Sequence, residues 1–329
     1  MLPLLFTFWL GASSAPLPSQ LMAPIRAIHL STHGGGRDWG SAVIEPTMAE
    51  LRSVGANWVA IHPYARISAD GSVRFHRQPG DPSVRRPIRA AKAAGLKILI
   101  KPHLAYWGSP FAWRGEIEFE ATDAWSRFWM EYREWILWLA EATEGADGFI
   151  VGTELDRTLG READWRQLIA DLRRRTSMPL SYAANWTDFE SVPFWDALDF
   201  VAVQAYFPVA DSENPDQAEL DAHWGALAAR LADYSRRVRR PIVLSELGYN
   251  WNAVAAKTPW EYRSDGPDYE ALQLRCFRAA LTAIEAEPAI LGAFLWKWFP
   301  QPRPVGHNFP LATVNMRALL REFWLAAGD

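Results

Sequence analysis

The feature that most constrains this chain is a regular alternation of short apolar runs with amphipathic helical segments, from residue 26 to residue 327. The apolar runs are nearly continuous, which is expected of strands in a parallel sheet that is buried on both faces. Eight such strand–helix units in a chain of 329 residues predict an α/β fold, a single-domain (β/α)8 TIM barrel.

The expected strands are residues 26–30, 57–65, 97–105, 148–155, 179–186, 200–208, 241–249 and 290–300. The expected helices are 45–56, 82–95, 123–145, 162–176, a short one near 194–199, 217–240, 269–288 and 316–327. An open doubly wound sheet would usually carry a glycine fingerprint directly after its first strand. The glycine-rich stretch HGGGRDWG has the wrong spacing, and no helix start follows it at once. The barrel is therefore expected to occupy residues 25–329.

Charge and cysteine content exclude several classes of function. The net charge of −4 leaves no basic footprint, so nucleic acid is not an expected partner. A single cysteine, Cys276, allows neither an internal disulfide nor a cysteine-based zinc site. No H-E-x-x-H motif occurs, and His29 and His33 do not share a helical face. We expect no metal and no organic cofactor.

The first 20 residues, MLPLLFTFWLGASSAPLPSQ, join an apolar stretch to small residues and resemble a secretory signal peptide. This predicts a secreted or periplasmic protein. No Lys or Arg precedes the apolar run, and Pro16 follows Ala15, the best cleavage residue. A retained N-terminal membrane anchor is therefore the alternative. No later segment is long and apolar enough to span a bilayer, so no stable span is expected once the signal is removed.

Polar and aromatic residues stand at the C-terminal end of nearly every predicted strand, which is where this type of barrel collects its chemistry. In chain order they are His33, His62, Tyr64, Lys101, His103, Glu154, Asn185, Trp186, Tyr206, Glu246, Trp296 and Trp298. One polar strand end would be unremarkable, but a full ring of them indicates a site. The 18 tryptophans add flat apolar faces of the kind that stack on sugar rings.

Two carboxylates in this ring suggest a reaction. Glu154 ends the fourth strand and Glu246 ends the seventh, so they face each other across the barrel mouth. A lone glutamate at a strand end usually forms an ion pair. Two carboxyl groups across a cleft are what glycoside hydrolysis requires, since one donates a proton and the other attacks the anomeric carbon or activates water.

Five stretches also resemble a known family. GANWVAIHPYA, LKILIKPHLA, the turn from Trp113 to Ile117, FIVGTEL and IVLSELGY are similar to glycoside hydrolase family 113. The resemblance runs from about residue 25 to residue 325. It implies a (β/α)8 barrel of the clan of retaining β-glycosidases, in a family whose characterised members are mostly β-1,4-mannanases.

The resemblance also implies roles for individual residues. By similarity Glu154 is the general acid/base, Glu246 is the nucleophile, and Tyr206 matches the clan's tyrosine partner of the nucleophile. Many clan members have Asn before the acid/base, where Thr153 stands here, so Thr153 or Asn185 would contact the sugar. The other candidates for substrate binding are His62, Tyr64, Lys101, His103, Trp186, Trp296 and Trp298, with Trp39 and Trp107 as candidates for distant sugar subsites.

Other functions were weighed against this one. A serine hydrolase would need a G-x-S-x-G elbow, and the sequence has none. A non-catalytic carbohydrate-binding barrel would use the same aromatic residues, but it would not need both glutamates. A glycosidase of the same clan with a substrate other than mannan also stays open. The expected partner in each of the carbohydrate readings is a polysaccharide or an oligosaccharide.

Overall fold

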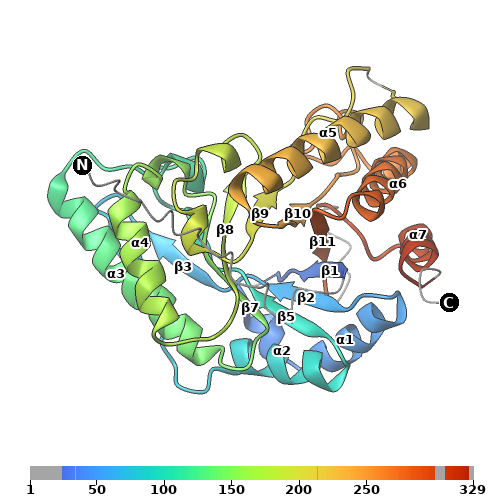
Figure 1. Ribbon diagram of the computed structural model, residues 1–329. Coiled ribbons are helices and arrows are strands. Elements are labelled where there is room, and N and C mark those ends of the chain that lie inside the picture. The colour runs from blue at the N-terminus through green and yellow to red at the C-terminus, as the bar shows by residue number, and fades with distance from the viewer. Residues whose placement is uncertain (1–23, 34, 213, 301–307, 326–329) are drawn as a thin grey trace, which may run out of the picture.

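The computed structural model describes residues 24–33, 35–212, 214–300 and 308–325, and the predicted signal peptide at residues 1–20 lies outside them. Eight parallel strands close into a barrel in the order β1-β11-β10-β9-β8-β7-β5-β2, and helices surround it (Figure 1). The predicted (β/α)8 fold is confirmed. The barrel strands are β1 (Ile25–Leu30), β2 (Trp58–Ile61), β5 (Lys97–Ile100), β7 (Gly148–Thr153), β8 (Leu180–Asn185), β9 (Val201–Gln204), β10 (Ile242–Leu247) and β11 (Ile290–Trp298).

The helices agree with the predicted segments to within a few residues. They are α1 (Ile44–Ser53), α2 (Pro82–Ala93), α3 (Thr122–Ala142), α4 (Glu162–Arg173), α5 (Gln217–Val238), α6 (Glu270–Ala286) and α7 (Val314–Leu325). The short helix expected near 194–199 is a 3-10 turn, η6 (Trp195–Ala197), in the connection from β8 to β9. Three helix starts have side-chain caps: Asp81 accepts from the Ser83 N–H at 2.8 Å, Asp216 accepts from the Glu219 N–H at 2.9 Å, and Thr313 accepts from the Met316 N–H at 3.1 Å.

Two of the predicted strands are each interrupted by a proline. The run 57–65 divides at Pro63 into β2 and β3 (Tyr64–Ile67), and the run 97–105 divides at Pro102 into β5 and β6 (His103–Ala105). Proline has no N–H to donate to a sheet, so both strands leave the barrel at the same level. β3 and β6 then pair with each other, beside β4 (Val73–Arg74), in a small sheet at the barrel mouth. This places the side chains of residues 62 and 101 at the rim.

Close packing of α3 and α4 against β7 explains why residue 152, two positions before Glu154, is a glycine. A Cβ at Gly152 would lie 2.5 Å from the Trp165 ring of α4 and 3.1 Å from the Tyr132 hydroxyl of α3. Real Cβ atoms do not approach other atoms this closely, so only glycine fits. The Tyr132 hydroxyl donates to the Val151 carbonyl of β7 at 2.8 Å, which ties α3 to this strand. The strand that ends at Glu154 is therefore fixed from behind.

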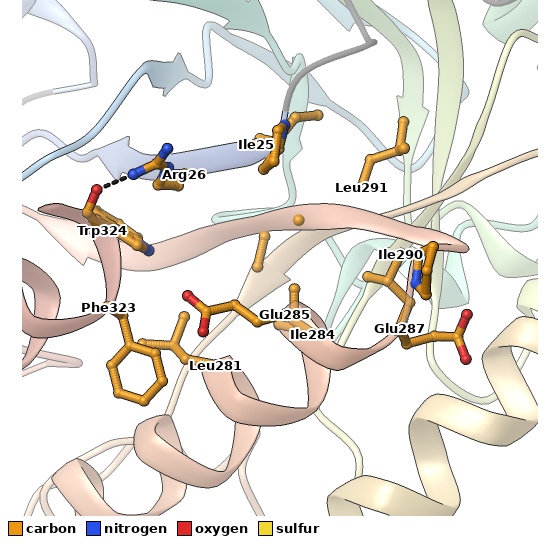
Figure 2. A pocket seen from close by; sticks show the side chains of 14 residues that line it. Ile25, Arg26, Leu281, Ile284, Glu285, Glu287, Ile290, Leu291, Phe323 and Trp324 are labelled. Atoms are coloured by element: carbon orange, nitrogen blue, oxygen red, sulfur yellow. Dashed lines mark hydrogen bonds between the residues drawn. The ribbon is translucent and has the colours of Figure 1, made fainter. Parts of the chain in front are cut away.

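A cavity of about 550 Å³ lies at the end of the barrel opposite the mouth, between α6, α7 and the starts of β1 and β11. Its wall is mostly apolar, with Leu281, Ile284 and Phe323 among the side chains that line it (Figure 2). Arg26 donates to the carbonyl oxygen of Trp324, which joins β1 to α7. This is the N-terminal end of the strands, away from the end where such barrels carry their chemistry. None of the described helices has the length and apolar character needed to cross a bilayer.

Candidate active site

Glu246 lies in β10 and is held by two donors. Its Oε1 pairs with the ammonium group of Lys101, and its Oε2 accepts a hydrogen bond of 2.6 Å from the Tyr206 hydroxyl. The Glu246 side chain is only 6% exposed and that of Lys101 is fully buried. Both carboxylate oxygens therefore have a partner that favours the ionised form.

Glu154 directly follows β7 and turns out of the strand direction. Its backbone has a φ of +49°, a left-handed conformation that non-glycine residues seldom adopt. The Glu154 N–H still donates to the Ala183 carbonyl at 2.8 Å, and the next N–H, of Leu155, donates to the Tyr182 hydroxyl at 2.7 Å. Strained backbone held by its surroundings is common at functional sites. Here it directs the side chain toward Arg114, whose Nη1 lies 2.6 Å from Glu154 Oε2.

Arg114 comes from the short 3-10 turn η3 (Arg114–Glu116), which Trp113 and Gly115 shape. The Trp113 ring lies so close over Gly115 that a Cβ there would be 2.1 Å from it. The turn is closed by the Glu116 carboxylate, which accepts from the Ala112 N–H at 3.0 Å. Arg114 was not among the residues predicted for the site, because its turn stands out in the sequence only as part of the family resemblance.

His103 connects the two carboxylates through their cationic partners. Its Nε2 lies 2.8 Å from Lys101 Nζ, and its Nδ1 lies 3.5 Å from Arg114 Nη2. Burial, together with the charges of Lys101 and Arg114, holds the pKa of His103 well below its usual value, so the ring is neutral. A neutral imidazole can accept from Lys101, which explains how three basic groups fit side by side.

The two carboxyl groups have opposite pKa shifts. Burial would raise the pKa of Glu246, but the charge of Lys101 and the hydrogen bonds from Lys101 and Tyr206 outweigh it, and the pKa is lowered. Burial raises the pKa of Glu154, and the negative charge of Glu246 adds to this, so that Arg114 offsets the rise only in part. One group is thus kept ionised and the other is disposed to hold a proton, the pattern that identifies an acid and a nucleophile or base.

A cavity of about 530 Å³ opens beside Glu154. Aromatic residues form much of its wall: Tyr106, Trp113, Trp186 and Trp260. The rings of Trp186 and Trp260 stack with centroids 5.4 Å apart, and Trp260 is 48% exposed. Asn185 and Tyr206 also line this cavity. Its size and its aromatic faces suit one or two sugar rings.

Three further predicted residues form an aromatic cluster beside Glu246. His62 is fully buried, and its ring centroid lies 5.0 Å from that of His103 and 5.2 Å from that of Trp296. Tyr64 is half-buried and meets His103 edge-on at 6.1 Å. Lys101 Nζ is 5.9 Å from the centre of the Trp296 ring. His62 lies behind the residues that face the site, so its role there is to support them.

Besides His62 and Lys101, which have no exposed surface, three more residues that were predicted to contact substrate are only 1% exposed. Trp39 is 1% exposed, because its ring packs edge-on against His62 and its N–H donates to the Ser31 carbonyl at 3.3 Å. It has no free face for a distant sugar. Thr153 is also 1% exposed, and its hydroxyl donates to the Pro102 carbonyl at 3.0 Å. Its proton is therefore not free for a substrate hydroxyl.

Trp298 was also a candidate for substrate binding, but it is 1% exposed and packs beneath Arg317 of α7. The pairing of β11 with β1 changes register between Ile28 and Leu30, which breaks the two-residue alternation at this point. Trp107, in contrast, is 53% exposed and lies next to Tyr64, where it could meet a longer substrate.

We expect a large loss of turnover when the hydroxyl of Tyr206 is removed. Tyr206→Phe keeps the ring but deletes the hydrogen bond that orients the Glu246 carboxylate, and misplacing a reacting group can cost about 100-fold in rate. The expected result is a kcat about 10- to 100-fold lower, with KM little changed. The pKa of Glu246 should rise, which moves the acid limb of the pH profile upward. An unchanged kcat and an unchanged acid limb would show that Tyr206 only fills space.

No group of three or more His, Cys, Asp or Glu side chains in the described ranges is arranged to hold a metal ion.

Comparison with known proteins gives a family match and a shared fold. The family model for Glycoside Hydrolase Family 113 matches residues 31–306. The GH113 β-mannanase from Alicyclobacillus acidocaldarius, solved in complex with ManMIm, superposes with a TM-score of 0.82 at 23% identity over 94% of this chain and 99% of that chain. A GH113 β-1,4-mannanase gives 0.80 at 18% identity over 93% and 100% of the two chains. A β-glucuronidase from Faecalibacterium prausnitzii gives 0.60 at 14% identity over 92% and 49%. No curated protein matches the sequence.

Proposed function

Because the chain belongs to glycoside hydrolase family 113, we propose that it hydrolyses β-linked polysaccharide or oligosaccharide, of the β-1,4-mannan type, by double displacement with retention. The observation that carries the proposal is a pair of buried glutamates at the barrel mouth with different partners, Lys101 and Tyr206 for Glu246 and Arg114 for Glu154, which shift their pKa values in opposite directions. A binding protein has no need of one carboxyl group that stays ionised beside another that is disposed to hold a proton.

In the first step, the ionised carboxylate of Glu246 attacks the anomeric carbon while the protonated Glu154 gives its proton to the leaving oxygen. The C–O bond to the leaving sugar breaks, and a glycosyl ester forms on Glu246. The negative charge of Glu246 opposes the positive charge that develops on the sugar in the oxocarbenium-like transition state. As Glu246 becomes an ester it loses its charge, so Lys101 and the Tyr206 hydroxyl must weaken their hold on it at the same time.

In the second step, Glu154, now a carboxylate, removes a proton from water as that water attacks the anomeric carbon. The ester bond to Glu246 breaks, and both carboxyl groups return to their starting states. Arg114 stabilises Glu154 while it is ionised, which is the state between the two steps. The wall of Trp186 and Trp260 supplies apolar faces on which the leaving sugar could stack.

The mannan assignment comes from the family and from the printed activity of its solved members, and it is tested with a panel of substrates. Reducing ends are measured after incubation with mannan, glucomannan, cellulose and xylan. We expect the wild-type protein to release reducing ends from mannan and glucomannan. The variant that carries both Glu154→Gln and Glu246→Gln should release none. Release from one of the other polymers, and not from mannan or glucomannan, would show that the substrate belongs to a different class. Binding of a polymer without release, unaffected by the two substitutions, would leave a carbohydrate-binding barrel.

A further inference from the structure

Lys297 is a charged residue inside an otherwise apolar strand, and the reaction above does not use it. It lies in the β11 sequence ILGAFLWKW, next to Trp296, and is only 6% exposed. Lysine is almost never buried unless it is paired. Its position therefore calls for an explanation.

Aromatic rings surround the ammonium group of Lys297. Its Nζ lies 4.8 Å from the centre of the Trp296 ring, 5.5 Å from that of Tyr262 and 5.4 Å from that of Phe299. Ring faces attract a cation but accept no conventional hydrogen bond, so they replace only part of the water that burial removes. Tyr262 is 64% exposed, which leaves this side of the cluster open to an incoming sugar.

No carboxylate of the described residues forms an ion pair with Lys297. The one negative charge that acts on it is Glu246, beyond ion-pair distance, and the oxygens of Glu246 are already occupied by Lys101 and Tyr206. Burial lowers the pKa of Lys297 to about 8, with Glu246 opposing the shift, so the group still carries a charge at neutral pH. It is a buried cation without its own anion.

The charges of the whole site are also out of balance. Three cationic side chains, Lys101, Arg114 and Lys297, face the two carboxyl groups of Glu154 and Glu246. A third carboxyl group, that of Asp156, lies on the Glu154 side, where burial and the charge of Glu154 raise its pKa to about 7, so it offsets the positive charge only in part. The three neighbouring histidines do not add charge, because burial holds the pKa values of His29, His62 and His103 well below the usual range. Lys101 and Arg114 each have a carboxylate partner. The excess positive charge therefore lies at Lys297.

We propose that Lys297 is a specificity residue, and that its ammonium group binds the carboxylate of a uronic acid in the sugar that lies against Trp296. An ammonium group and a carboxylate form a short, charge-assisted hydrogen bond, which would supply the missing anion. The adjoining aromatic faces would hold the ring of the same sugar. The inference rests on the proposed glycoside hydrolysis and narrows its substrate to a β-linked chain with an acidic sugar at this position.

The test compares pairs of ligands that differ only at C6. One pair is β-1,4-linked mannuronate and mannose oligomers of equal length, and the other is β-1,4-linked glucuronate and glucose oligomers. Binding is measured by calorimetry with the Glu154→Gln protein, so that no ligand is consumed. We expect the acidic member of at least one pair to bind 10-fold or more tightly than the neutral member.

Variants of Lys297 assign that preference to the residue. Lys297→Met in the same background should lower the ratio of affinities 10-fold or more, and Lys297→Arg should keep most of it. Glu154→Gln leaves Arg114 without its anion in every one of these proteins, so any acid preference from Arg114 is the same in all of them and the fall in the ratio reports on Lys297. Lys97→Met, a half-buried lysine at the start of β5 and so at the opposite end of the barrel, is the matched control and should keep the full ratio.

Equal affinity for acidic and neutral members of both pairs would overturn the proposal, as would a preference that survives Lys297→Met. Equal weakening of both members by Lys297→Met would also overturn it, since the lysine would then bind a hydroxyl group. These measurements do not depend on turnover. Failure of the proposed hydrolysis, seen as no release of reducing ends by the wild-type protein from either the neutral polymers or the acidic oligomers, is therefore distinguishable from failure of this inference.

Discussion

Glu246→Gln is expected to lower kcat about 10⁴-fold or more, which corresponds to about 5.4 kcal/mol of lost transition-state stabilisation. The amide keeps the size of the side chain and one acceptor oxygen, but it cannot form the glycosyl ester. The fold loss relative to wild type should be similar for natural substrates and for aryl glycosides with good leaving groups, because the missing step is the attack itself. Initial rates with both kinds of substrate check the prediction.

A loss of the fold must be separated from a loss of the nucleophile. Glu246→Gln leaves the buried Lys101 without its anion, and breaking a buried pair in this way costs about 3–5 kcal/mol of stability. Thermal unfolding of the variant is therefore measured beside that of Glu120→Gln, an exposed glutamate, which should behave as wild type. A test on the wild-type protein is also available. A 2-deoxy-2-fluoro glycoside with a good leaving group should label Glu246, and labelling of another residue would exclude it as the nucleophile.

Much of the barrel could be predicted because burial on both faces makes its strands continuous apolar runs. The strand boundaries at two prolines, Pro63 and Pro102, could not be predicted. Residues 57–65 and 97–105 each look like one strand, since β-forming residues continue past Pro63 and Pro102. Only the pairing of backbone groups shows that the second halves belong to a different sheet. The interruption has a use, because it turns Lys101 toward Glu246 and His103 toward both cationic partners.

The candidate site was predicted best where a residue ends a barrel strand. Glu154, Glu246 and Lys101 all do, and the closed parallel sheet brings such ends to one mouth whatever the loops are. Trp39 lies in a connection, where sequence gives no direction for a side chain, and Trp298 lies past a shift in register. Spacing therefore could not show that both are buried.

Two charged residues were missed for different reasons. Arg114 lies in a loop that is far from Glu154 in the sequence, and only the packing of Trp113 on Gly115 brings it to the carboxylate. Lys297 stands inside an apolar run, where a single charge is a signal in its own right. The same reasoning that drew attention to Glu154, a charge at the end of an apolar strand, would have identified it.

Glu154→Gln is expected to have an effect that depends on the leaving group, which distinguishes an acid/base from a nucleophile. For natural oligosaccharides, whose leaving oxygen needs a proton, kcat/KM should fall about 10²- to 10⁴-fold. For a dinitrophenyl glycoside, whose leaving group needs no proton, formation of the glycosyl ester should be nearly as fast as in wild type. Hydrolysis of that ester should be slow, because no base activates water. A burst of dinitrophenol followed by a slow steady state is the measurement that shows this.

The pH profile gives an independent check of the same residue. The pKa of Glu154 is raised and the acid must be protonated for the first step, so wild-type kcat/KM should fall as the pH rises through that pKa. The pKa of Glu246 is lowered and the nucleophile must be ionised, so activity should be lost on the acid side only as the pH falls through that lower pKa. Glu154→Gln has no group to titrate, so its alkaline limb should disappear with the dinitrophenyl substrate, and added azide, which needs no base, should restore turnover. The acid/base would be another residue if the alkaline limb survives the substitution or if azide does not raise the rate. Arg114 and Glu154 would then form only a structural ion pair.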